Sequence, residues 1–424
     1  MPLWKLHGDG TLQPGGVVAP DERLSWGKTI GLGAQHVVAM FGATFVFPLL
    51  MGLNPQLAVM MSGIATLIFL LVVRGRVPSY LGSSASFVGV ATAIYGAGGN
   101  PADLTGAMLW VGVLLFMVGV IIHFAGSRLI HAALPPVVTG AVVAVIGLNL
   151  AGIPVKNMAP TGFDAWMQAV TFVCVALVAV FTRGMTQRLL ILVGLFVASI
   201  VYGLLTNVMG LGTPIDFSGI ASAAWIGKPN FAAPVFDANA MLLIAPVAII
   251  LVAENLGHIK AVSAMTGRDL DPYIGRAFVG DGIATMVSGS AGGTGVTTYA
   301  ENIGVMAATK IYSTAVFVVA ALIAVLLGFS PKFGALIQAI PLAVMGGVSI
   351  VVFGLITIAG AKIWVDNKVD FSDNRNLVVA AITLILGTGD YTLRFGGFTL
   401  GGIGTATFGA ILMWLLLGRG GSKA

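Results

Sequence analysis

The chain has 424 residues, of which 57% are hydrophobic and 9% are charged, and it carries a formal net charge of +5. A soluble domain has about a quarter of its residues charged, so this composition excludes a soluble protein and indicates a polytopic membrane protein. The single cysteine, Cys174, excludes an internal disulfide.

The chain begins with a polar segment and continues as a series of apolar runs. Residues 1–28 carry several charges and contain no cleavable signal, so we expect a cytoplasmic N-terminal segment. From Thr29 to Leu417 the apolar runs predict about 14 transmembrane segments. When alternate loops are assigned to alternate sides, only Lys156, Lys228, Lys332 and Arg394 of the 21 basic residues fall on one side. This asymmetry places both termini in the cytoplasm, and it argues against nucleic-acid binding as the reason for the positive charge.

Two polar features interrupt the apolar pattern in the first half of the chain. Gln35 and His36 lie in the first segment, and for His36 an interhelical hydrogen bond and a substrate contact remain equal alternatives. The stretch from Arg76 to Phe87 is rich in small polar residues and precedes a helix of about ten residues. We therefore expect an extended stretch in segment 3 that leads into a half-helix.

The second half holds two of the three glutamates in the chain, Glu254 and Glu301. A carboxylate at the centre of a bilayer costs about 2.5–3.5 kcal/mol, so both are expected to face a protein interior or a wet cavity. Glu254 and His258 are four residues apart and share one helix face, which suits a proton relay or a substrate contact. A zinc site would need a third ligand that is missing, and we expect no metal and no cofactor. The glycine-rich stretch from Gly289 to Glu301 predicts a second extended stretch and half-helix, in segment 10.

The two halves resemble each other in sequence. Leu134–Val142 is similar to Ile340–Val348, and Gly63–Thr66 recurs as Gly282–Thr285. The second offset also aligns Gln35-His36 with Glu254-Asn255. Seven segments per repeat is an odd number, so we expect an all-α 7+7 inverted repeat with a substrate site where the broken helices meet.

The residues from Glu301 to Lys310 resemble the signature of the nucleobase-ascorbate transporter family: an acidic or amide residue, Asn-x-Gly, then Thr and a basic residue. Gln35-His36, Leu81–Ser84 and Glu254–His258 extend the likeness. Within this family the chain is most similar to the bacterial uracil permeases, especially the permease associated with pyrimidine utilisation.

The resemblance implies a core domain of segments 1–4 and 8–11 and a gate domain of segments 5–7 and 12–14. In this sequence the core domain would comprise residues 29–127 and 239–329, and the gate domain residues 128–238 and 330–418, followed by a cytoplasmic tail at 419–424. It also implies a homodimer in the inner membrane that imports a base together with a proton.

The same resemblance implies the site. Glu254 and Glu301 would bind substrate, with His258 joining them in proton coupling, and the further substrate contacts would be Gln35, Ser84, Ala85, Tyr299 and Ala300. Three positions depart from the uracil permeases: Ala85 and Phe353 stand where those proteins have Phe and Tyr, and Ala300 stands where they have Gly. We therefore expect the shape of the pocket, and how closely the backbone approaches the substrate, to differ from those of the uracil permeases.

The chemistry of uracil fits this interpretation. Its N–H groups can donate to carboxylates while its carbonyl oxygens accept from backbone N–H groups. The alternatives are a purine carrier of the xanthine or urate type, an anion exchanger of the same fold, a passive uniporter, and a membrane enzyme that uses Glu254 and His258 as acid and base. Two carboxylates suit an anion poorly, and no nucleophile or metal set supports an enzyme.

Overall fold

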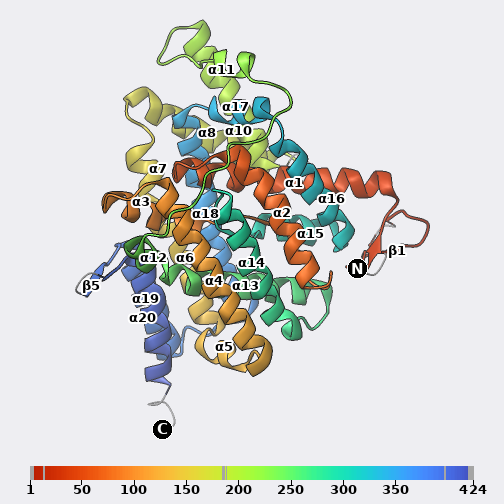
Figure 1. The fold of residues 1–424 in the computed structure, drawn as a ribbon, viewed down its shortest axis with the longest axis vertical. Coiled ribbons are helices and arrows are strands. Elements are labelled where there is room, and N and C mark those ends of the chain that lie inside the picture. Colours follow the sequence, from red (N-terminus) through yellow and green to blue (C-terminus); the bar gives the residue numbers. More distant parts are fainter. Residues whose placement is uncertain (1–3, 13–14, 184–186, 188, 396–397, 419–424) are drawn as a thin grey trace.

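The computed structural model describes residues 4–12, 15–183, 187, 189–395 and 398–418, and its regular structure is mainly helical (Figure 1). The first half contains β1 (Lys5–Leu6), β2 (Glu22–Arg23), α1 (Trp26–Leu50), α2 (Pro55–Val72), β3 (Leu81–Ser83), η1 (Ala85–Phe87), α3 (Val88–Gly96), α4 (Pro101–Ala125), α5 (Arg128–Ala133), α6 (Pro136–Leu150), α7 (Gly152–Asn157), α8 (Gly162–Phe181), α10 (Leu190–Gly203), η2 (Leu204–Val208) and α11 (Ser218–Ser222). The second half contains α12 (Ala238–Ile244), α13 (Pro246–Thr266), η3 (Asp271–Tyr273), α14 (Ile274–Ser290), β4 (Val296–Thr298), α15 (Ala300–Thr309), α16 (Thr314–Gly328), α17 (Pro331–Gln338), α18 (Leu342–Asp366), α19 (Asn374–Thr388), β5 (Leu393–Phe395), β6 (Phe398–Leu400) and α20 (Gly402–Leu417).

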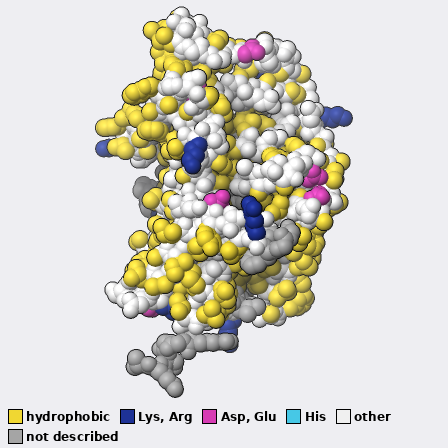
Figure 2. Space-filling view, turned by 90° about the vertical axis from the view of Figure 1, so that its left-hand side faces the viewer, with side chains coloured by type: hydrophobic (Ala, Val, Ile, Leu, Met, Phe, Trp, Pro, Cys, Tyr) yellow, Lys and Arg dark blue, Asp and Glu magenta, His cyan; other side chains and the backbone are white. Residues whose placement is uncertain are grey.

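Many of these helices are apolar enough to lie in a bilayer. By length and composition, 8 helices among the described residues could cross a membrane, and α16 with α17 forms a further pair bent by 84°. Figure 2 shows one face of the molecule, where hydrophobic side chains spread widely and charged side chains stand apart from one another. The chain is therefore a multi-pass membrane protein. The first helix starts at Trp26, slightly before the expected Thr29, and the count of 14 segments stays a prediction because α3, α19 and α20 are short.

Asparagine and proline set the start of two of the long helices. Asn54 precedes Pro55, and its side chain accepts hydrogen bonds from the N–H groups of Gln56 and Leu57. Asn100 precedes Pro101 and forms a capping box with Asp103 at the start of α4. Such caps satisfy N–H groups that a helix leaves without partners, and proline fits the first helical position.

The helices pack as two related sets. In one set α4 packs against α14, α2 against α14 and α16, and α1 against α16. In the other α6 packs against α18, α8 against α10 and α18, and α19 against α6 and α20. If α1, α2, α4, α6, α8 and α10 are exchanged with α13, α14, α16, α18, α19 and α20, each of these contacts maps onto a contact that is also present. This is the packing expected of a two-fold repeat.

The repeated sequence motifs occupy matching places. α6 begins at Pro136 and α18 at Leu342, which are equivalent positions of the first repeated motif. In the second motif, Thr66 Oγ1 accepts a hydrogen bond from Leu81 N–H at 2.9 Å, and Thr285 Oγ1 accepts one from Val296 N–H at 3.3 Å. Each threonine thus holds the start of one extended stretch.

Glycine allows the closest helix packing in the interior. Gly119 and Gly275 face each other where α4 crosses α14, and a Cβ atom on Gly119 would lie 2.7 Å from the carbonyl oxygen of Gly275. Small residues at such crossings let two backbones approach, which is the main source of packing energy between helices in lipid. α4, α6, α13, α14 and α18 lie in the central part of the view in Figure 1.

The two extended stretches meet in the interior as a short antiparallel sheet. In β3 and β4, Leu81 pairs with Thr298 and Ser83 with Val296. The hydroxyl groups of Ser83 and Thr294 lie 2.7 Å apart and extend this pairing. Because β3 leads through η1 into α3 and β4 leads into α15, the sheet places the starts of two half-helices close together.

Candidate functional site

One cavity collects most of the residues that the sequence singled out, and we call it the carboxylate cavity. It has a volume of about 290 Å³ and is lined by residues from α1, β3, η1, α13, β4 and α15 on one side and from α6 and α18 on the other. The lining residues are Ala43, Phe47, Ser83, Ala85, Val143, Glu254, His258, Thr297, Thr298, Tyr299, Ala300, Glu301, Leu355, Ile356, Ile358, Ala359 and Lys362.

Most of the predicted site residues line this cavity, and two do not. Glu254, Glu301, His258, Ala85, Tyr299 and Ala300 are among the lining residues. Ser84 is fully buried outside the cavity, because its hydroxyl accepts the N–H of Ser86 and its own N–H donates to the Gly295 carbonyl. Gln35 is also buried on α1, away from the lining, and its Nε2 has no hydrogen-bond partner in the described part of the chain. Ser84 and Gln35 therefore do not line the carboxylate cavity in this structure, and their contact with substrate stays a prediction.

Glu254 lies on α13 at the wall of the cavity. The Ser86 hydroxyl donates a hydrogen bond to Glu254 Oε2 at 3.3 Å. His258 follows one turn later on the same helix face, so both groups point into the same space. A carboxylate and an imidazole in this arrangement can both exchange protons with a ligand or with water.

The hydrogen bonds behind His258 determine which of its ring nitrogens carries a proton. Asn255 Oδ1 accepts from the backbone N–H of Thr298 at 3.2 Å, which fixes the orientation of the amide, and it also accepts from the Thr298 hydroxyl at 2.7 Å. With its proton donated to Asn255, the Thr298 Oγ1 atom must accept from His258 Nδ1 at 2.8 Å. In the neutral imidazole, Nε2 is therefore a hydrogen-bond acceptor.

The same amide connects the cavity wall to a buried carboxyl group on α14. Asn255 Nδ2 donates to Asp281 Oδ2 at 2.8 Å, and both residues are fully buried. Among the described residues, the other oxygen of Asp281 has no hydrogen-bond partner. Asp281 and Asn255 thus support Thr298 and His258 from behind.

Glu301 lies in the first turn of α15, where the backbone N–H groups have no partners within the helix. Tyr299, which precedes α15, donates its hydroxyl to the Ser83 carbonyl at 2.8 Å and accepts from Thr44 at 3.0 Å. The Tyr299 hydroxyl therefore ties α1 to β3. At this end of α15 the cavity offers N–H donors beside a carboxylate acceptor.

The sequence left two roles open for His36, an interhelical hydrogen bond and a substrate contact, and the structure shows the hydrogen bond. Asn302 Nδ2 donates to both the ring nitrogen Nδ1 and the carbonyl oxygen of His36, each at 3.0 Å. The His36 ring also packs against Phe317, with the ring centroids 4.6 Å apart. His36 is fully buried and does not line the carboxylate cavity.

The sequence did not point to the residues that close the cavity from α1 and α18. Phe47 lines the cavity and stacks on Phe353, with an angle of 3° between the rings and 6.1 Å between their centroids. Lys362, near the end of α18, places a cation at the same cavity as the two glutamates. These residues carry no motif, and only the packing of α18 against the first half of the chain brings them to the site.

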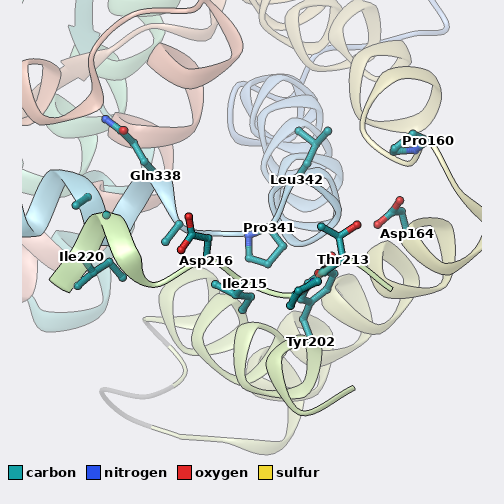
Figure 3. A pocket seen from close by; sticks show the side chains of 14 residues that line it. Pro160, Asp164, Tyr202, Thr213, Ile215, Asp216, Ile220, Gln338, Pro341 and Leu342 are labelled. Atoms are coloured by element: carbon teal, nitrogen blue, oxygen red, sulfur yellow. Dashed lines mark hydrogen bonds between the residues drawn. The ribbon is translucent and has the colours of Figure 1, made fainter. Parts of the chain in front are cut away.

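A larger cavity of about 470 Å³ lies elsewhere, between α8, α10, the loop before α11 and the α17–α18 junction (Figure 3). Asp164, Asp216 and Tyr202 face it, but their polar groups already have local partners. Asp164 accepts from the Thr161 hydroxyl at 2.6 Å, Asp216 accepts from Ser218 N–H at 2.8 Å, and Tyr202 donates to the Thr213 carbonyl at 3.1 Å. The start of neither half-helix, α3 or α15, lines this larger cavity. The carboxylate cavity is therefore the better candidate for a ligand site.

Comparisons with known proteins agree with this architecture. A model of the Permease family matches residues 27–394. The chain belongs to the Permease family. Among its relatives, this permease is 62% identical over 423 residues to a protein of Escherichia coli (strain K12) designated pyrimidine permease RutG, covering 99% of this chain and 95% of the relative. It is 41% identical to the uracil permease of Bacillus caldolyticus, with 94% of each chain covered.

Solved structures show the same fold at low sequence identity. The murine Solute Carrier 26 family member A9 anion transporter in the inward-facing state has a TM-score of 0.68 and 11% identity, over 96% of this permease and 70% of that chain. The transmembrane domain of the cyanobacterial bicarbonate transporter BicA has a TM-score of 0.63 and 15% identity, over 85% of this permease and 95% of that chain. These likenesses establish the transporter fold that the inverted repeat predicted, and they carry no information on the substrate.

Proposed function

We propose that this permease imports uracil or a related pyrimidine base together with a proton. The observation that carries the proposal is that Glu254 and Glu301 line one cavity together with the start of the α15 half-helix. The names of the relatives, a pyrimidine permease and uracil permeases, support the same class of substrate.

The polar groups of the cavity suit a neutral, donor-rich base. Glu254, Glu301 and His258 Nε2 supply acceptors for ring N–H groups, and the first-turn N–H groups of α15 supply donors for the carbonyl oxygens. Ala85 leaves room beside the base where the uracil permeases have Phe, whereas Ala300 adds a methyl group where they have Gly. In this proposal Glu254, His258 and Glu301 also carry the coupling to the proton.

We propose that transport proceeds by alternating access between a core domain (29–127 and 239–329) and a gate domain (128–238 and 330–418). The two sets of packed helices support this division, because the carboxylate cavity is lined by α1 of one set and by α6 and α18 of the other, together with α13 and α15. A homodimer in the inner membrane with both termini in the cytoplasm completes the proposal.

Radiolabelled uracil uptake into vesicles that contain the purified protein tests this function. With acid outside, labelled uracil should accumulate above its external concentration, and unlabelled thymine or xanthine added in excess should rank the related bases. Equal uptake with and without the proton gradient would contradict symport and indicate a uniporter.

The same vesicles test the second candidate function, an anion exchanger, which is the kind of function carried by two solved proteins of the same fold. Two carboxylates at one cavity oppose it, because they repel an anion unless both are neutral. Bicarbonate or sulfate should therefore neither be taken up nor compete with uracil. Uptake of either anion that uracil does not inhibit would favour the exchanger instead.

A further inference from the structure

A second cavity lies directly behind the carboxylate cavity, and we call it the Asp390 cavity. It has a volume of about 270 Å³ and lies between α3, α6, the start of α13 and the start of α20. Its polar lining includes Ser86, Asn149, Asp390, Thr392 and Thr399. A polar space of this size, with several donors and acceptors, admits water.

Ser86 forms the wall between the two cavities. The residue lines the Asp390 cavity and is fully buried, and its hydroxyl donates to Glu254 Oε2 at 3.3 Å. Glu254 lines the carboxylate cavity on the other side of this bond. A single hydrogen-bonded hydroxyl therefore separates the Asp390 cavity from the carboxylate.

One face of α13 runs past both cavities. Val247 and Ile250 line the Asp390 cavity, whereas Glu254 and His258, further along the same helix, line the carboxylate cavity. On α6 the order is reversed, since Val143 lines the carboxylate cavity and Asn149 near the helix end lines the Asp390 cavity. The two cavities therefore lie toward opposite ends of these helices, with Glu254 between them.

The Asp390 cavity is built around a fixed carboxylate. Asp390 adopts a left-handed backbone conformation with φ of 49°, and its Oδ1 accepts from Gly402 N–H at 2.9 Å. Asn149 Nδ2 donates to Gly387 O at 2.8 Å and also lies 3.4 Å from Asp390 Oδ1. These hydrogen bonds hold the Asp390 carboxylate in place at the cavity.

We propose that the Asp390 cavity is the route by which Glu254 takes up its proton from the side of the membrane opposite to that reached through the carboxylate cavity. The proton would then leave with the base through the carboxylate cavity, so that both cross the membrane in the same direction. The proposal rests on the proposed function, because it assigns a route to the proton of that symport.

The transfer step is balanced by a single concerted shift. The Ser86 hydroxyl proton moves to the Glu254 carboxylate at Oε2, and a hydronium ion in the Asp390 cavity gives the replacement proton to Ser86 Oγ and becomes water. The hydroxyl both gives and takes one proton and is unchanged by the step.

Several other ionisable groups act on Glu254. On its own helix His258 lies one turn away, and from α15 and α18 Glu301 and Lys362 line the same cavity. From α14 the buried carboxyl of Asp281 faces Asn255, the residue next to Glu254. Asp390 lies across the second cavity. A pH profile of transport therefore reports on all these ionisable groups together. A test of the proton route must use a measurement that does not depend on their charge.

Cysteine accessibility tests the route independently of transport. In a Cys174→Ser background, Ala93→Cys reports on the Asp390 cavity and Ala359→Cys on the carboxylate cavity. A membrane-impermeant thiol reagent should label Ala93→Cys from one side and Ala359→Cys from the other. Labelling of both from the same side would overturn the proposal.

Transport by Ser86 variants tests the hydroxyl itself. Ser86→Ala should lower proton-driven uracil uptake at least about tenfold while the Kd for uracil stays within about threefold, and Ser86→Thr should restore uptake. Uptake by Ser86→Ala that follows the proton gradient as wild type does would contradict the role of the hydroxyl. A wild-type protein that fails to move uracil would instead refute the proposed function, while the labelling pattern would still decide whether the two cavities open to opposite sides.

Discussion

Glu301 combines an acceptor and a helix terminus at one point of the carboxylate cavity. Its carboxylate lies in the first turn of α15, beside N–H groups that have no partners within the helix. A base bound there can donate to the carboxylate and accept from the backbone.

Glu301→Gln should weaken uracil binding by about 2 kcal/mol, or about thirtyfold in Kd, because the amide presents an N–H to a ligand N–H. Equilibrium binding of labelled uracil to the purified protein measures this change. Glu22→Gln is the matched control, since Glu22 is the remaining glutamate and lies outside the cavity, where it bonds His7 and Ala19. Equal affinities of Glu301→Gln and the control would exclude Glu301 from the binding site.

The sequence revealed the residues of the site whose chemistry is rare in a membrane. Glu254 and Glu301 could be predicted because a carboxylate in lipid is costly, and His258 because it lies one helical turn from Glu254. Phe47 and Lys362 could not, because an aromatic or a terminal lysine is ordinary in a transmembrane helix. The Ser84 hydroxyl accepts the N–H of Ser86 at the turn into η1, which the sequence did not predict, and its expected contact with substrate stays a prediction.

At the scale of elements, the β3–β4 crossing sets the geometry of the cavity. It depends on glycines that let the two stretches approach aromatic rings. A Cβ atom on Gly82 would lie 2.5 Å from the Tyr299 ring, and one on Gly295 would overlap the Phe87 ring. Both rings belong to residues at the start of the half-helices, so a displaced ring would displace a half-helix.

Gly295→Ala should therefore destabilise the protein by about 1–3 kcal/mol, the usual cost of overpacking, and weaken uracil binding. Gly304→Ala is the matched control within α15, because no atom lies within 4 Å of its added Cβ. It should leave thermal stability unchanged or raise it by up to about 1 kcal/mol. Thermal unfolding of the purified variants in detergent measures both, and a Gly295→Ala protein as stable as Gly304→Ala would contradict the packing argument.

The N-terminal segment is held to the loop between α13 and α14 by an ion pair. Arg268 Nη2 donates to Asp21 Oδ1 at 2.6 Å. This hydrogen bond holds the pKa of Asp21 below its ordinary value of 3.8, against a smaller opposing effect of burial. Since the pKa is lowered in the folded state, the pair stabilises the protein above pH 3.8, and this stabilisation is lost as the pH falls through the lower folded value.

Asp21→Asn should lower stability by less than about 1 kcal/mol at pH 7, because the two side chains are 44% and 35% exposed and solvent screens the pair. The difference in Tm between wild type and variant should shrink as the pH falls below 3.8. In an Arg268→Met background the same substitution should have no effect at either pH. A difference that grows on acidification would reverse the assigned sign.

The sequence predicted the two extended stretches and half-helices because glycine, serine and threonine interrupt apolar runs at matching places. It did not predict that the stretches pair with each other, since antiparallel register depends on contacts between distant segments. The bend of 84° between α16 and α17 was also missed. Ser330 caps α17 and Pro331 occupies its first turn, a local start signal inside an otherwise continuous apolar region.

At the scale of the whole molecule, the fold and the orientation rest on different arguments. The two-fold packing and the structural likenesses establish the fold, whereas the orientation comes from the distribution of Lys and Arg residues. In a Cys174→Ser background, Ala125→Cys at the end of α4 should be labelled only from the cytoplasm. Ala224→Cys, in the exposed loop after α11, should be labelled only from outside. Reversed labelling would invert the topology, and labelling of both from one side would refute the segment count.

The central claim is that Glu254 couples uracil uptake to the proton. A charged carboxylate is costly to move through an apolar barrier, so protonation of Glu254 would favour the conformational change that carries the base. The most direct test is accumulation of labelled uracil in vesicles with an acid-outside gradient, for wild type and Glu254→Gln. Wild type should concentrate uracil, whereas Glu254→Gln should exchange labelled for unlabelled uracil without concentrating it. A Glu254→Gln protein that concentrates uracil in response to the gradient as wild type does would contradict the claim.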